Sequence, residues 1–283
     1  MKEKIDLVLT DIKKLPAMSS IVAKVLQLVN DPNVNIQTLA TEISKDTSIT
    51  ANVIKLSNSA YYRPSKPIRT VPEALMTLGT KTVKEIVLIT AAKGILEKDL
   101  QGYQIESDNL WLHSLMVAEL ASRISSHRKL PLPKDLVFTS GMLVDIGKLV
   151  LAQFFQPVLF QLREELKTSN APFYELEKKY FGYTHMEISG KLLTIWNFPN
   201  ELIDVVTNYN TPELSKTNPL LSSVVHIANT ILVVSGIGID IGGISTPLSP
   251  FALEKTGLSE ADIQSFFVQI PEIETSIQDL RKI

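Results

Sequence analysis

The chain contains no cysteine, so disulfide bonds, thiolate metal ligands and thiol nucleophiles are excluded. Its formal net charge is only −2, which gives no electrostatic reason to expect a nucleic acid or an anionic membrane as partner. No uninterrupted apolar run reaches the roughly 18 residues of a membrane span, and the N-terminal segment MKEKIDLVLTDIKK mixes charged with apolar residues. We therefore expect a cytoplasmic protein that uses neither a membrane nor a nucleic acid.

Strand signals are scarce as well. Apolar residues instead recur at three- and four-residue spacing, as in the segment from Met18 to Val29, which is typical of helices with one buried face. A length of 283 residues is compatible with one large domain or two lobes. The sequence predicts an all-α protein without significant β-sheet.

Local signals indicate where several helices of the first hundred residues begin and end. Asn35 and Asp46 are placed to cap the helices that follow them. Thr70 and Glu73 have the spacing of a capping box, and Gly79 marks the end of the helix that they begin. These residues predict a bundle of short helices joined by tight turns.

The second half shows the same periodicity. It predicts helices over 110–124, over 137–155, through Leu162 and Leu166, from about 185 to 196, and over 259–280 with an interruption at Pro271. The polar stretch 98–108 is expected to be a seam between two lobes. The Gly- and Pro-rich residues 235–250 are expected to form an irregular crossing.

Several segments together resemble the HDOD domain, the HD-related output domain of bacterial signalling proteins. The matching segments are LPAMSSIVAKVLQLVNDP (15–32), ISKDTSITANVIKLSNSAYY (43–62), IRTVPEALMTLG (68–79), LWLHSLMVAELASRI (110–124), VDIGKLVL (144–151) and FGYTHMEISGKLLTIWNFPNELIDVV (181–206). The resemblance implies a two-lobed, HD-like helical bundle over 12–230, with lobes at 12–98 and 106–230. Residues 231–283 would form a C-terminal extension.

The resemblance also implies where metal ligands would lie in an active HD phosphohydrolase. An early His falls on His113, the His-Asp pair falls on Val144 and Asp145, and a late Asp falls on Asn229. A further histidine of two-metal relatives matches His185. The adjacent His-His pair of those relatives is replaced by Tyr209 and Asn210.

These replacements weaken the case for an enzyme. Valine has no lone pair to offer a cation, and Asn229 lacks the charge of a carboxylate. A catalytic zinc usually needs three protein ligands and an open position for water. We therefore expect no catalysis, no cofactor and no bound metal. The alternative is a residual metal-dependent phosphohydrolase or phosphodiesterase, acting on a nucleotide through a rebuilt site.

Each surviving polar residue admits two interpretations. His113 is either a buried histidine bonded to a neighbour such as Asp145, or a retained ligand. Asp145 between apolar residues needs a partner, which His113 or Lys148 could supply. Lys148 is three residues further on and is alternatively solvated. His185 is either a pocket residue or a polar group at a helix start.

Other polar residues carry weaker signals. His127 is expected at the surface and His226 in the core, and Ser114 and Ser140 show no recognisable catalytic triad. The loop 61–70 presents Arg63, Lys66 and Arg69 beside two tyrosines. It is either a patch for a phosphate or a partner, or a solvated connection.

Taken together, the residues and the resemblance predict a stand-alone, non-catalytic module of bacterial signal transduction that binds a partner protein or a small ligand. A polar pocket between the lobes is expected around His113, Asp145, His185, Asn229 and Lys148. A purely structural interaction domain, with these side chains bonded to one another, is the third possibility. The identities of ligand, partner and pathway stay open, as does the oligomeric state.

Overall fold

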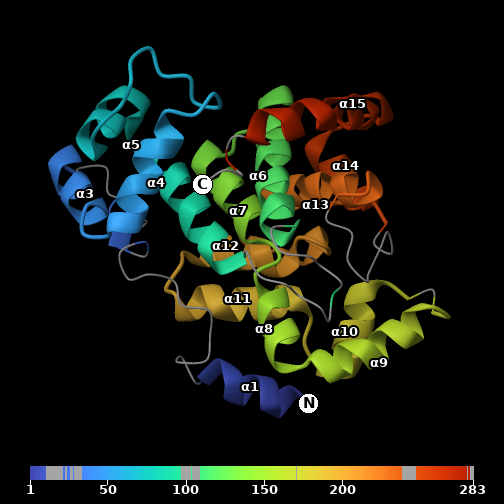
Figure 1. The fold of residues 1–283 in the computed structure, drawn as a ribbon. Coiled ribbons are helices and arrows are strands. Elements are labelled where there is room, and N and C mark those ends of the chain that lie inside the picture. Colours follow the sequence, from blue (N-terminus) through green and yellow to red (C-terminus); the bar gives the residue numbers. More distant parts are fainter. Residues whose placement is uncertain are drawn as a thin grey trace. The chain divides into compact units, whose positions relative to one another are not determined.

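The computed structural model describes residues 1–10, 22, 24–25, 28, 34–96, 103, 109–169, 171–237, 247–278 and 280. Packing divides the chain into two compact units, each described here by itself. Unit 1 comprises Met1–Ala17 and Leu96–Ile270, and unit 2 comprises Met18–Ile95 and Pro271–Ile283. The described residues form helices and contain no strand, which confirms the predicted all-α class (Figure 1). The lobe limits drawn from the resemblance stay predictions.

Unit 2 contains the helices α3 (Ile36–Ile43), α4 (Thr47–Ser57) and most of α5 (Val71–Leu96). The two predicted N-caps are confirmed. Asn35 Oδ1 accepts from the N–H of Gln37 at 2.8 Å, and Asp46 Oδ1 accepts from the N–H of Ile49 at 3.0 Å. The predicted helix over 18–29 falls mostly outside the described residues.

The start of α5 follows the prediction only in part. Thr70 Oγ1 accepts from the N–H of Glu73, but the Glu73 carboxylate accepts from the N–H of Arg69 rather than that of Thr70. Gly79 has non-helical angles (φ 85°, ψ 161°) inside α5, so a break occurs where the sequence predicts one. Glycine reaches this positive φ without the steric cost that a Cβ would add.

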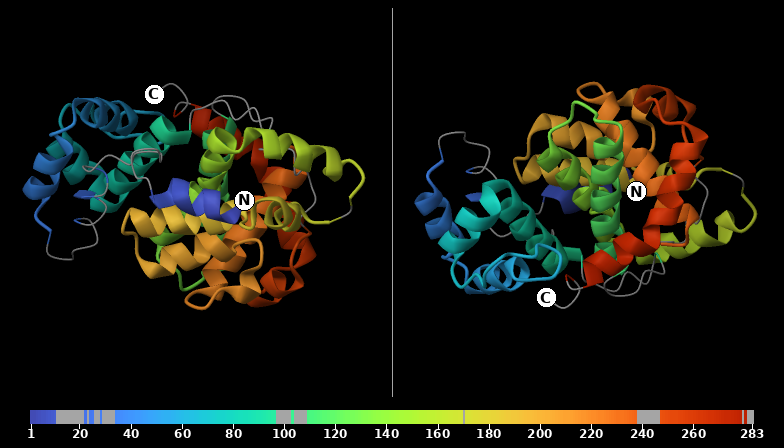
Figure 2. Two further views of the ribbon diagram at one scale, coloured as in Figure 1. Left: turned by 90° about the horizontal axis from the view of Figure 1, so that it is seen from below. Right: turned by 90° about the horizontal axis from the view of Figure 1, so that it is seen from above.

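Unit 1 is the larger unit. Its helices are α1 (Lys2–Thr10), α6 (Asn109–His127), α7 (Lys134–Leu143), α8 (Gly147–Phe154), α9 (Gln156–Leu166), α10 (Phe173–Phe181), α11 (His185–Ile195), α12 (Asn200–Asn208), α13 (Pro219–Val234), α14 (Pro250–Thr256) and the first part of α15 (Glu260–Ile277). Helix α6 packs against α7 and α13, and α11 packs against α8 and α12 (Figures 1 and 2). The core of unit 1 therefore gathers around α6 and α11.

The single helix predicted over 137–155 is wrong, because α7 ends at Leu143 and α8 begins at Gly147. Ser189 of α11 holds this break: its Oγ accepts from the N–H of Gly147 at 2.8 Å and lies 3.1 Å from the carbonyl oxygen of Val144. A Cβ on residue 147 would lie 2.0 Å from the carbonyl oxygen of His185, so only glycine permits this approach. The break thus places Asp145 in a turn beside α11.

The predicted interruption at Pro271 is also wrong, because α15 continues through that residue. Proline removes one helical hydrogen bond, and burial can outweigh that loss. Ile270, Ile273 and Ile277 are at most 6% exposed. The irregular crossing predicted over 235–250 lies largely outside the described residues, and Ser249 caps α14.

Among the described residues, no single helix has the length and apolar composition to cross a membrane. One pair bent by 110°, Lys134–Phe154 with Gln156–Leu166, satisfies that criterion jointly on length and composition alone.

Candidate functional site

Asp145 is the centre of the candidate site. It lies in the turn between α7 and α8 and is 1% exposed. Its Oδ2 accepts a hydrogen bond from Lys148 Nζ at 2.9 Å, and its Oδ1 accepts one from the hydroxyl of Tyr209 at 2.8 Å. Both carboxylate oxygens are thus bonded to donors of the chain itself.

Two histidines approach the same carboxylate. His113 Nε2 is 3.6 Å from Oδ2 of Asp145 and 2.9 Å from Oδ1 of Asn229. His185 Nε2 is 3.4 Å from Oδ1 of Asp145 and 2.9 Å from the Tyr209 hydroxyl oxygen. We call this set the polar centre: His113, Asp145, Lys148, His185, Tyr209 and Asn229. All six residues belong to unit 1.

The surroundings of Asp145 determine its charge. Burial alone would raise the pKa of its carboxyl group. The positive charge of Lys148 lowers this pKa most, and those of His185 and His113 lower it further. Together they outweigh burial and hold the pKa well below its usual range. Asp145 is therefore a buried carboxylate, and Lys148, 7% exposed, is its counter-ion rather than a solvated side chain.

Two further residues extend the polar centre and were missed by the sequence analysis. Glu177 of α10 is fully buried: its Oε1 accepts from the hydroxyl of Tyr103 at 2.6 Å, and its Oε2 lies 2.6 Å from Nδ1 of His185. Oε2 also accepts from the N–H of His185 at 3.0 Å. Tyr103 in turn lies with its ring 5.9 Å from Nζ of Lys148. Glu177 therefore fixes the orientation of the His185 ring.

A weak signal for Glu177 is present in the sequence. It shares the helical face of Phe173, Leu176 and Phe181, all of which are buried. A charge on an apolar helix face needs a partner. No such signal exists for Tyr103, which lies 74 residues from Glu177 in the chain.

The polar centre does not fit a metal ion. The ammonium of Lys148 already lies against one oxygen of Asp145 and would repel a cation there. The Tyr209 hydroxyl lies between the other oxygen and Nε2 of His185. Val144 is buried and offers no ligand. Within the described ranges, no group of three or more His, Asp or Glu side chains is arranged to hold a metal ion.

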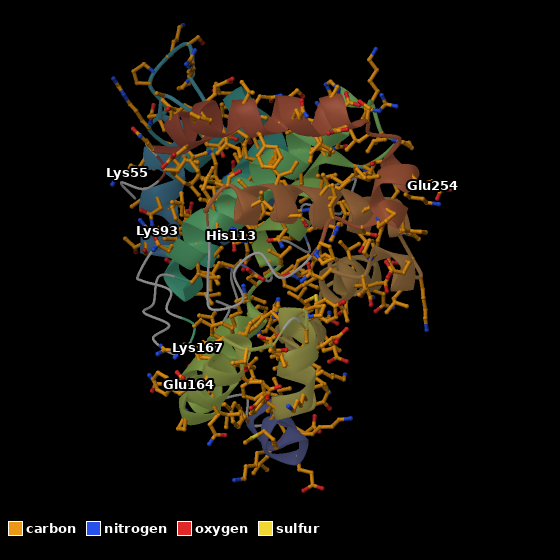
Figure 3. The ribbon with its side chains drawn as sticks, turned by 90° about the vertical axis from the view of Figure 1, so that its right-hand side faces the viewer. Lys55, Lys93, His113, Glu164, Lys167 and Glu254 are labelled. Carbon is orange, nitrogen blue, oxygen red and sulfur yellow. The ribbon has the colours of Figure 1, made fainter. Side chains whose placement is uncertain are left out.

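The structure brings together all five predicted pocket residues. His113, Asp145, Lys148, His185 and Asn229 are between 1% and 8% exposed and lie inside one unit. His185 combines the two roles left open by the sequence, because it is the first residue of α11 and also part of the polar centre. Figure 3 shows His113 on α6 among interior side chains, whereas Glu164 and Lys167 lie at the surface.

The remaining histidines and serines lie as expected. His127 has a side chain 44% exposed and contacts Asp262 at 2.8 Å. His226 is fully buried, its Nε2 accepts from the N–H of Ser249, and burial lowers its pKa to about 4. Ser114 and Ser140 are buried on α6 and α7; Ser140 Oγ donates to the carbonyl oxygen of Leu136, and Ser114 Oγ has no hydrogen-bond partner among the described residues.

Arg63, Lys66 and Arg69 lie elsewhere in the chain. All three are exposed and belong to unit 2, in the connection between α4 and α5.

These features define an all-helical, HD-like protein whose central carboxylate is neutralised by a lysine. Residues 15–212 match the family model of the HDOD domain, and the chain belongs to this family.

Similar structures support the fold. An HDOD domain protein of Geobacter sulfurreducens has a TM-score of 0.76 and 22% identity, covering 97% of this chain and 96% of that one. A protein of Marinobacter aquaeolei VT8, provisionally named a signal transduction protein, has a TM-score of 0.78 and 20% identity over 98% of this chain and 64% of that one. A Shewanella amazonensis SB2B protein, provisionally named a phosphohydrolase, has a TM-score of 0.67 and 22% identity over 93% and 97%.

A curated protein of Treponema pallidum (strain Nichols), described as uncharacterized, is 24% identical over 230 residues. The match covers 80% of this chain and 44% of that protein, so the chain spans less than half the length of this relative.

Proposed function

We propose that this chain is a non-catalytic regulatory module of bacterial signal transduction that acts by binding a partner. The family and the name given to the Marinobacter structure support a signalling role. The observation that carries the proposal is the pairing of Asp145 with Lys148 and Tyr209, because it occupies both oxygens of the carboxylate.

The chemistry of hydrolysis explains why this pairing matters. A metal-dependent phosphohydrolase needs a cation that lowers the pKa of a bound water and an open coordination position for it. In the polar centre, the positive charge comes from an ammonium group that has no vacant orbital for water. The Tyr209 hydroxyl is hydrogen-bonded to both Asp145 and His185.

The same pairing bears on the kind of partner. A small ligand in the polar centre would have to displace side chains that are at most 8% exposed and already bonded to one another. Breaking buried hydrogen bonds to charged groups costs about 1.5–3 kcal/mol each. The buried network therefore favours a protein partner, bound at another surface, over a small ligand bound at the centre. The lack of cysteine suits a cytoplasmic setting.

The test is metal content together with turnover. Tag-free protein expressed with iron, manganese and zinc should contain far less than one metal per chain and should hydrolyse neither nucleotides nor cyclic dinucleotides. The variant Val144→His/Lys148→Ala/Tyr209→His restores two imidazoles and removes the ammonium, and serves as a positive control for metal uptake. A matched negative control is Lys167→Ala at the surface.

One tightly held metal per chain in the wild type, with turnover abolished by a chelator and restored by manganese, would refute the proposal. That result would establish the alternative, a residual phosphohydrolase or phosphodiesterase with a rebuilt site.

A further inference from the structure

The loop between α4 and α5 is closed by one side chain. Asn58 donates through Nδ2 to the carbonyl oxygen of Ile68 at 2.7 Å and accepts at Oδ1 from the N–H of Ile68 at 2.8 Å. The same amide donates to the carbonyl oxygen of Ile54 in α4. Ile68 is 4% exposed, whereas Asn58 is exposed, so the base of the loop is buried on the Ile68 side. Residues 59–67 are therefore held between fixed ends.

Arg63 adopts an uncommon conformation at the tip of this loop. Its φ is 43°, in the left-handed region that costs a side chain with a Cβ roughly 1 kcal/mol or more. Two hydrogen bonds hold it there, from its N–H to the carbonyl oxygen of Ser59 and from its Nε to that of Ala60. Among the described residues, Nε is the one guanidinium nitrogen of Arg63 with a hydrogen bond, and its terminal nitrogens point to no partner there.

The loop also concentrates positive charge. Between positions 47 and 72 the chain has no Asp or Glu but carries Lys55, Arg63, Lys66 and Arg69. Residues 34–96 hold eight Lys and Arg against four Asp and Glu, a net charge of +4. The rest of the chain holds twenty against twenty-six, a net charge of −6. Among the described residues, no acidic side chain forms an ion pair with Arg63, Lys66 or Arg69.

We propose that this clamped loop, residues 58–70, is a docking surface for an acidic segment of a partner protein, with Arg63, Lys66 and Arg69 contacting its carboxylates. The inference rests on the proposed function only in requiring a protein partner. Guanidinium groups bind carboxylates through paired hydrogen bonds, and a rigid loop loses less conformational entropy on binding than a flexible one.

A nucleic acid fits this surface less well. Single strands bind where aromatic faces are open for stacking. Here Tyr61 and Tyr62 are only half-exposed, and their rings pack against each other edge to face with centroids 4.8 Å apart. The net charge of −2 on the whole chain also opposes a long polyanion.

The direct test uses a short fluorescein-labelled peptide rich in Asp and Glu, followed by anisotropy at about 0.15 M salt, where distant charges are screened. The wild-type chain should bind this peptide and not its Asn/Gln copy. Arg63→Gln/Lys66→Gln/Arg69→Gln should weaken binding about tenfold or more, because charge-assisted hydrogen bonds are lost. The matched control is Lys134→Gln/Lys216→Gln/Lys255→Gln, which removes the same charge from exposed positions of unit 1.

A second variant separates shape from charge. Asn58→Ala leaves every charge in place but opens the clamp, and should weaken peptide binding several-fold with unchanged helical circular dichroism. Equal losses in both triple variants, or no binding by the wild type, would overturn the proposal. Loop-dependent binding of an oligothymidylate or of anionic vesicles in preference to the peptide would also overturn it. None of these measurements involves the polar centre, so they are independent of whether the chain has metal-dependent activity.

Discussion

The polar centre of unit 1 contains a buried, paired cation, whereas the loop 58–70 of unit 2 carries exposed cations. Lys148 is 7% exposed and bonded to Asp145. Arg63, Lys66 and Arg69 are exposed, with no ion pair among the described residues. Burial makes an unpaired charge very costly, whereas water stabilises an exposed one. The buried lysine therefore stabilises the folded chain, and the loop cations are accessible to another molecule.

The largest effect should come from breaking the buried pair on one side only. Asp145→Ala leaves the Lys148 ammonium without its carboxylate and should lower the free energy of unfolding by about 3–5 kcal/mol. Lys148→Met should also destabilise the chain, whereas Asp145→Ala/Lys148→Met should cost less than the sum of the two single changes. Urea unfolding of the four proteins measures this coupling. Strict additivity would show that the two groups do not depend on each other.

His226 is a buried titratable group of unit 1 that, unlike Lys148, has no ion-pair partner among the described residues. Its pKa of about 4 lies below the 6.5 of an unperturbed histidine. As the pH falls, the unfolded chain takes up the proton first. Stability is therefore full above about pH 6.5 and falls until about pH 4, by up to about 3 kcal/mol.

His226→Gln should remove that loss, as measured by urea unfolding at several pH values between these limits. His127→Gln, at a side chain 44% exposed, should leave the loss in place. A loss of stability that persists in His226→Gln would assign it to another group.

A smaller change should follow from removing one hydroxyl of the polar centre. Tyr209→Phe leaves Oδ1 of Asp145 and Nε2 of His185 without their shared partner and should cost about 1–3 kcal/mol. Tyr183→Phe is the matched control, because its hydroxyl bonds to Asp6, whose side chain is 44% exposed, and should matter less. Equal midpoints of thermal unfolding for the two variants would contradict the structural role of Tyr209.

The smallest effect on global stability is expected in the loop. Asn58→Ala removes bonds to the partly buried backbone of Ile68 and should cost about 1 kcal/mol. Amide hydrogen exchange of residues 59–67 should nevertheless rise, because the ends of the loop are no longer fixed. Asn208→Ala, which removes an amide bonded to Asp204 of the same helix, should leave that exchange unchanged.

Local features were predictable from the sequence because their causes are local. Asn35 and Asp46 cap the helices that directly follow them, and Gly79 breaks α5 within its own turn. The end of α7 was not predictable, since apolar residues continue on both sides of Asp145, at Val144 and Ile146. The cause of that break, Ser189, lies 42 residues further along the chain from Gly147.

In the candidate site, too, some residues were predictable from the sequence and others were not. The resemblance identified His113, Asp145 and His185, and the spacing of Lys148 allowed its bond to Asp145. The burial of Lys148 depends on packing around α8, and Tyr103 comes from a distant segment that carries no motif. Sequence reasoning therefore identified residues that surround Asp145 but left open whether His113 or Lys148 is its partner.

The positive charge beside Asp145 is part of the polypeptide itself, in the side chain of Lys148. A protein whose buried carboxylate is neutralised by a bound ion gains stability in proportion to the logarithm of the free ion concentration. In this chain the neutralising charge is synthesised with the protein, at a ratio of one to one, and cannot be diluted or chelated. The folded state of unit 1 should therefore be equally populated in metal-starved and metal-replete cells.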